Sequence, residues 1–182
     1  MAKAQRKTID MVFVLLGLAM TAVLLFIGGL ASYGYHFATS SVRSELSQQK
    51  VFFPAAGSPA LTALPQADQQ AMSKYAGQQL VNGQQAKVYA NNFINVHLQE
   101  VAGGQTYAEV STAALKDPTN QKLQGEKQTL FQGETLRGLL LGDGYAYWTF
   151  GMLALYAAIA SFIGAGVMAI LVLLGLRHMS KL

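Results

Sequence analysis

The sequence predicts an all-α membrane protein in which two transmembrane helices flank an extracytoplasmic helical domain of the helical-bundle kind. Two stretches without a charged side chain, 11–42 and 145–176, lead to this prediction. A helix needs roughly 20 mostly apolar residues to cross a bilayer, and each stretch is longer than that. The segment between them shows helical periodicity and no convincing alternation of the kind that marks strands.

These stretches divide the chain into five parts. They are a cytoplasmic N-terminal tail (1–10), a first transmembrane helix with its outer interface (11–37), an extracytoplasmic helical domain (38–144), a second transmembrane helix (145–176) and a cytoplasmic C-terminal tail (177–182). A cleaved signal peptide is the alternative for the first span. Its apolar core would be about 7–15 residues long, which is shorter than the stretch 11–30.

The distribution of charge predicts the orientation. The two tails carry the whole net charge of +4, because the eight basic and eight acidic residues of the domain cancel. Lys and Arg close to a span are retained on the cytoplasmic side, whereas long loops are translocated largely regardless of their charge. We therefore expect a bacterial plasma membrane protein with both termini in the cytoplasm, and we expect no nucleic acid among its partners.

In the first half of the domain, proline and glycine mark the expected helix ends. The helix of the first span should continue outside the membrane until Pro54 ends it. A loop is expected over 53–65. Within it, Ser58 should be the N-cap of a helix, with Pro59 at the first helical position. A helix is expected over 66–80, with Met72, Tyr75 and Leu80 on its buried face. The clearest soluble helix covers 84–101, and Gly103-Gly104 should cap its end.

Capping signals also place the helices of the second half. Thr106 and Glu109 have the spacing of a capping box, which predicts a helix from there to about Lys116. Asp117-Pro118 should cap the next helix, over about 119–141. The sequence Gly142-Asp143-Gly144 should kink that helix or separate it from the second span.

The second span offers a face for helix packing. Small residues let helix backbones approach closely in lipid. Four of them lie four residues apart, with a glycine beside the row: Ala157, Ser161, Ala165 and Ala169, next to Gly164. We expect a helix–helix contact along this face with the first span, with a second copy or with another protein. The alternative is that small residues are simply common in membrane helices.

Residues that carry chemistry are few and scattered. There is no cysteine, and the three histidines are far apart in the sequence, with Glu100 the nearest carboxylate to His97. Metal sites need several convergent ligands. We therefore assign no catalytic, cofactor-binding or metal-binding residue and expect no enzyme. Neither span contains Asp, Glu, Lys or Arg, which argues against a transporter or pump.

One charged pair lies close to the second span. Glu134 and Arg137 are three residues apart on one predicted helix face and can pair there. Arg137 could instead reach a lipid phosphate or the carboxylate of a partner. A weak surface pair is the alternative interpretation.

Two hypotheses of function follow. The first is a non-enzymatic accessory, scaffolding or assembly subunit of a larger membrane complex, whose partners are the bilayer and other membrane subunits or a second copy. The alternative is an extracytoplasmic binding module for a small molecule, a lipid or a cell-envelope polymer. In that case Tyr75, Tyr89 and Phe93 would line an apolar pocket between helices, although such aromatic residues more often form a core.

Three runs of sequence carry a resemblance to a known family. They are VRSELSQQKVFFPAAGSPAL (42–61), YAGQQLVNGQQAKVYANNFINVHL (75–98) and QTLFQGETLRGLLLGDGYAYWTFG (128–151). The chain resembles a group of two-span actinobacterial membrane proteins without established function. The resemblance implies no catalytic residue. Some members are labelled aromatic ring-opening dioxygenase; such an enzyme needs an iron site, and this sequence offers no plausible cluster of ligands for one.

Overall fold

The computed structural model describes residues 3–181, and side chains within residues 5–181. Met1, Ala2 and Leu182, which belong to the two expected tails, lie outside the described residues. The predicted all-α class is confirmed: residues 3–181 form helices and turns, with a single isolated bridge between Phe52 and Gln79 in place of any strand. The chain forms two compact units, one of residues 1–37 and 150–182 and one of residues 38–149.

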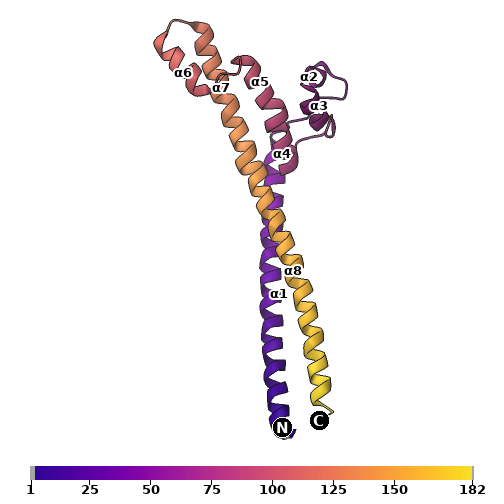
Figure 1. Ribbon diagram of the computed structural model, residues 1–182. Helices are drawn as coiled ribbons and strands as arrows, with labels where there is room; N and C mark the ends of the chain where they lie inside the picture. Colours follow the sequence, from indigo (N-terminus) through magenta and orange to yellow (C-terminus); the bar gives the residue numbers. More distant parts are fainter. Residues whose placement is uncertain (1–2, 182) are drawn as a thin grey trace. The chain divides into compact units, whose positions relative to one another are not determined.

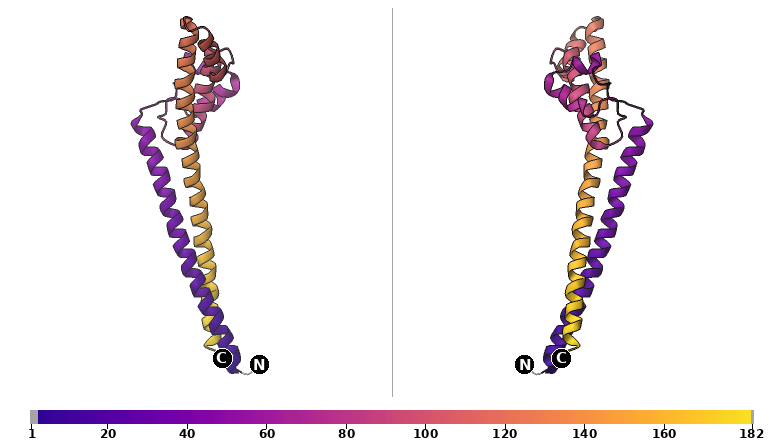
Figure 2. Two further views of the ribbon diagram at one scale, coloured as in Figure 1. Left: turned by 90° about the vertical axis from the view of Figure 1, so that its left-hand side faces the viewer. Right: turned by 90° about the vertical axis from the view of Figure 1, so that its right-hand side faces the viewer.

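The first unit contains most of two long helices that run side by side in opposite directions. They are α1 (Lys3–Gln48) and α8 (Tyr147–Met179), and both chain ends lie at the same end of the pair (Figure 1). The views in Figure 2 show the two helices together near the termini as well. By length and composition, α1 and the continuous helix Gln121–Met179 are each able to cross a membrane.

Most large apolar side chains of this unit are exposed. Phe13, Phe26, Phe150 and Ile163 are among the most exposed of them. The polar Thr21 lies in the middle of α1, and its hydroxyl donates a hydrogen bond to the carbonyl of Gly17 over 2.8 Å. The unit therefore satisfies its backbone and this hydroxyl internally while it presents hydrocarbon outward, as helices in lipid must.

In the second unit, the chain leaves α1 through an irregular segment. The expected helical extension of the first span is confirmed as far as Gln48. The helix ends in a turn in which Lys50 adopts a positive φ of 52°. Such a left-handed conformation is unfavourable for a residue with a side chain and is common just after a helix. Residues 51–54 then pair with 77–80 through backbone hydrogen bonds of 2.9–3.1 Å.

Two short helices connect these paired segments. Helix α2 (Pro59–Thr62) begins with the expected Pro59 after Ser58, although the Ser58 hydroxyl forms no capping bond. Helix α3 covers Gln66–Ser73 and is shorter than predicted. It ends early because residues 74–77 turn, with Gly77 at a φ of +71°, so that the following residues reach the segment after α1.

The predicted helix over 84–101 is present, and one π-helical turn divides it. Its parts are α4 (Gly83–Tyr89), the π-helical segment η1 (Ala90–Ile94) and α5 (Asn95–Val101). The side chain of Asn82 caps α4 by accepting from the amide of Gln85. The Gly103-Gly104 end is confirmed, since both glycines have positive φ and the Gly104 amide donates to the carbonyl of Gln99 over 2.9 Å.

Helix α6 (Tyr107–Lys116) begins with the predicted capping box. The Thr106 amide donates to the carboxylate of Glu109 over 2.7 Å, and the Glu109 amide donates to the Thr106 hydroxyl. The bond from the Thr106 amide, followed by that from its hydroxyl, lowers the pKa of the Glu109 carboxyl. This cap therefore contributes its stability above the pKa of the unfolded chain and loses it as the pH falls through the lowered folded value.

The last long helix of the unit, α7 (Gln121–Leu139), begins later than predicted. Asn120 caps it in place of Asp117, because its side chain accepts from the amide of Leu123 over 3.2 Å. Asp117 precedes proline, which disfavours the helical conformation at the residue before it, and its φ of −129° and ψ of 77° are not helical, so it ends α6 instead. Beyond α7, the π-helical segment η2 (Leu140–Ala146) leads into α8, so residues 142–144 do not interrupt the helix.

The unit has two apolar clusters. The larger joins the end of α1 to α2, α3, α4 and η2, and its buried members include Val42, Phe53, Met72, Leu80 and Leu140. The smaller, of Leu98, Ala102, Val110 and Leu130, lies between α5, α6 and α7.

Gly83, at the start of α4, allows this helix to pack closely against Gly144 and Trp148. A Cβ added at Gly83 would lie 2.6 Å from Cγ of Trp148 and 3.0 Å from the carbonyl oxygen of Gly144. Neither atom is the free end of a flexible side chain, so relief requires a shift of the backbone.

We predict that Gly83→Ala lowers the free energy of unfolding by about 1–3 kcal/mol through overpacking. Gly138→Ala is the matched control, because an added Cβ there meets no atom within 4 Å. That control should be neutral or stabilising by up to about 1 kcal/mol. Thermal unfolding followed by circular dichroism compares the two variants. Equal midpoints for Gly83→Ala and the parent chain would show that the approach is not tight.

Candidate functional site

A regular row of half-buried and buried residues runs along α1 in the first unit. Its members are separated by alternating steps of four and three residues, and they are Asp10, Val14, Gly17, Thr21, Leu24, Gly28, Ala31 and Tyr35. This alternation is the 3.5-residue repeat of a left-handed coiled coil. One narrow face of α1 therefore packs against the neighbouring helix.

Helix α8 carries the matching row. Steps of three and four again separate its members, which are Gly151, Ala154, Ala158, Ser161, Ala165, Met168, Val172 and Gly175. We call the contact between the two rows the seam. The structure places Ser161 and Ala165 of the predicted packing face in the seam, whereas Ala157 is exposed outside it.

The other two residues of the predicted face lie beside the seam. Gly164 is half-buried, and a Cβ added to it would contact Leu24 at 3.4 Å. Ala169 is half-buried as well. A contact of this face with a further protein stays a prediction.

Glycines bring the two backbones together along the seam. A Cβ added at Gly17 would lie 2.6 Å from Cγ2 of Val172, and one at Gly175 would lie 2.9 Å from Cγ2 of Val14. A Cβ at Gly28 would lie 2.8 Å from the ring of Phe162. Real side chains do not approach so closely, so glycine is required at these positions for the observed separation of the helices.

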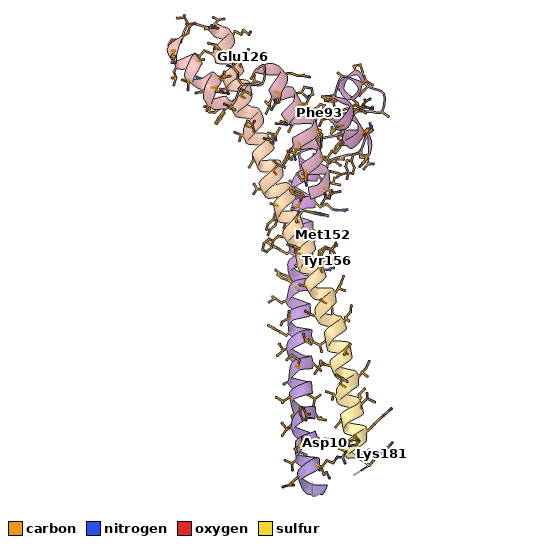
Figure 3. All side chains as sticks on the ribbon, in the orientation of Figure 1. Asp10, Phe93, Glu126, Met152, Tyr156 and Lys181 are labelled. Atoms are coloured by element: carbon orange, nitrogen blue, oxygen red, sulfur yellow. The ribbon has the colours of Figure 1, made fainter. Side chains whose placement is uncertain are left out.

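An acid and a histidine close the seam at the end that carries the termini. Asp10 and Lys181 are labelled at this end in Figure 3. Nε2 of His178 lies 3.8 Å from Oδ2 of Asp10, and that oxygen is buried and has no hydrogen-bond partner within the described residues. The pair becomes an ion pair when the histidine is protonated.

The second unit has a groove between the end of α1 and the helix formed by α7 and η2. It has a volume of about 610 Å³. Its floor contains the buried Val42, Leu46 and Leu140, and the exposed Leu136 and Leu139 form one wall. We call it the outer groove.

Polar groups border the apolar lining of the outer groove. Glu45 of α1 and Asp143 of η2 contribute one carboxylate from each side. No lysine or arginine lines the groove, and neither carboxylate forms an ion pair with another described residue. The sequence predictions did not include this site, because Glu45 and Asp143 are almost 100 residues apart.

Glu134 and Arg137 do lie together. Nη1 of Arg137 is 3.2 Å from Oε2 of Glu134, and its Nη2 donates to the side-chain oxygen of Asn91 over 3.3 Å. The bond to Asn91 connects α7 to η1 and was not predicted. The arginine therefore helps to join two helices of the second unit.

The predicted pocket aromatics lie in the larger apolar cluster. Phe53 is in ring contact with Tyr75 and with Tyr89, at centroid distances of 5.2 and 5.4 Å, and Tyr89 contacts Phe93 at 5.0 Å. Figure 3 labels Phe93 in the middle of this unit. Burial raises the pKa of the Tyr89 hydroxyl. None of the three predicted residues lines the outer groove.

An aromatic pair lies on the surface of the same unit. The rings of Tyr107, from α6, and Phe131, from α7, are 5.9 Å apart, yet 40% and 54% of these residues are exposed. Tyr107 and Glu134 also line a shallow depression between these helices. Aromatic side chains are enriched where proteins contact each other, so this pair is a candidate contact surface.

Two further findings bear on function. Among residues 3–181, no group of three or more His, Cys, Asp or Glu side chains is placed to hold a metal ion. Comparison with protein-family profiles, with curated proteins and with solved structures gives no match to this chain.

We predict that Gly17→Ala weakens the seam by about 1–3 kcal/mol, because the added methyl group overlaps the stiff, β-branched Val172. The double variant Gly17→Ala with Val172→Ala should recover part of this loss, since it removes the overlapping methyl groups. Unfolding in detergent measures both changes.

Gly29→Ala and Gly166→Ala are the matched controls, because a Cβ added at either glycine meets no atom within 4 Å. Each should be as stable as the parent chain or slightly more stable. Equal losses at positions 17 and 29 would mean that the seam does not hold the two helices together.

Proposed function

We propose that the chain is a non-enzymatic integral membrane protein that acts as an accessory, scaffolding or assembly subunit of a larger membrane complex. In this proposal α1 and α8 cross a bacterial plasma membrane, both termini are cytoplasmic and the helical domain is extracytoplasmic. The excess of Lys and Arg in the two tails supports the orientation. The resemblance to two-span actinobacterial membrane proteins is part of the same proposal.

The seam supports the membrane assignment. Large apolar residues cover most of the surface of both helices. In water, this exposed surface would cost roughly 25 cal/mol per Å² of apolar area. The seam covers one narrow face of each helix, and Phe13, Phe26 and Phe150 lie outside it. Lipid or a second membrane protein is the natural environment for that remaining surface.

The exposed pair Tyr107–Phe131 is the observation that carries the role as a subunit. It lies outside the two apolar stretches, so lipid contact does not account for it. An aromatic pair that leaves about half of each residue uncovered can bury substantial apolar area against a partner. The side chain of Glu134 beside it would add polar specificity to such a contact.

A photo-crosslinking amino acid at Phe131 tests this role in intact cells. We expect one discrete adduct, with another membrane subunit or with a second copy, and a stoichiometric complex after purification in mild detergent. Lys122 is the control position, because it lies on the same helix with its side chain 84% exposed and should give no adduct. A monomer without adducts at Phe131 would contradict the proposal, as would equal adducts at Lys122.

A further inference from the structure

We propose that the outer groove binds a single-tailed amphiphilic cation, that is, a molecule with one alkyl or aryl body and one ammonium group. This site is independent of the proposed role as a subunit and of the Tyr107–Phe131 pair. The proposal rests on an apolar groove that has one unpaired carboxylate on each side, from Glu45 and Asp143.

Size and lining favour a small organic ligand. A volume of about 610 Å³ lies within the range of roughly 300–1,000 Å³ of small-molecule sites. Along α1 the groove extends from Ser41 to Gln49, which at about 1.5 Å per residue is roughly 12 Å of helix. An extended octyl chain has a comparable length.

The walls provide the apolar part of the affinity. Leu136 and Leu139 are 44% and 54% exposed although they border a buried floor of Val42, Leu46 and Leu140. Covering them with a hydrocarbon chain removes apolar surface from water without any change in the core beneath.

The two carboxylates of the lining favour a positively charged ligand. The two carboxylates have no basic residue in the lining to neutralise them, so an anion entering the groove would be repelled from both sides. A hydrated divalent metal ion would contact the carboxylates but would leave the apolar lining exposed to water. An organic cation satisfies the carboxylates and the apolar lining together.

Asp143 lies in the π-helical segment η2. Segment η2 replaces an α-helical turn between Leu140 and Ala146, and such insertions are frequent at functional sites. Gly144 of the same segment is buried, and a Cβ added there would lie 3.0 Å from Cβ of Ala86. Close packing at Gly144 thus fixes the segment that carries the carboxylate.

Thermal unfolding of the full chain in a non-ionic amphipol tests the proposal. Octyltrimethylammonium, octyl glucoside and octyl sulfate are added at equal concentrations below micelle formation. A ligand that binds the folded state raises the midpoint with its concentration. We expect the cation to raise it, the sulfate to leave it unchanged, and added salt to weaken the effect of the cation.

Two sets of variants, each with its own control, locate the binding. Glu45→Gln or Asp143→Asn should weaken the apparent affinity for the cation about two- to fivefold, the range for exposed ion pairs, whereas Glu126→Gln, outside the groove, should not. Leu139→Ser should weaken it too, and Leu115→Ser, a more exposed leucine on α6, should not. Equal stabilisation by all three amphiphiles, or equal losses in the test and control variants, would overturn the proposal.

Discussion

The close approach of α1 and α8 at Gly17 and Val172 is the contact on which the first unit depends. Both helices are apolar on every side, so burial of hydrocarbon does not by itself select one face in a lipid environment. Shape selects it instead. Gly17, Gly28 and Gly175 allow the backbones to approach where Val172, Phe162 and Val14 project. This contact fixes how the two helices are aligned. The 3.5-residue repeat then keeps the same face of α1 against the same face of α8 along the seam.

The second unit is held together by different means. Its helices pack around two buried apolar clusters, and the caps at Asn82, Thr106 and Asn120 fix where three of them begin. The chain leaves α1 and returns through a short backbone pairing, which brings residues far apart in the sequence into one cluster. The same arrangement leaves the outer groove open, because the leucines of α7 that border it have no covering helix.

The sequence was sufficient for features set by local chemistry. The helix ends at Pro59, Gly103 and Thr106 agree with the structure because each depends on a few neighbouring atoms. The predictions failed where contacts between residues far apart in the sequence determine the structure. Helix α3 ends at Ser73 because the following chain pairs with residues 51–54. Of the packing face predicted on α8, Ala157 lies outside the seam, because hydropathy gives no contrast along an entirely apolar helix and two spacings of small residues were compatible with it.

Labelling of single cysteines in intact cells tests most directly whether the chain crosses the membrane twice. The natural sequence contains no cysteine, so each variant reports one site. Thr8→Cys, Lys122→Cys and Ser180→Cys leave the tail charges unchanged. With a membrane-impermeant maleimide, the account predicts labelling at position 122 in intact cells, and at positions 8 and 180 after permeabilisation alone. Labelling of either tail in intact cells, or protection of position 122, would contradict the two-span account.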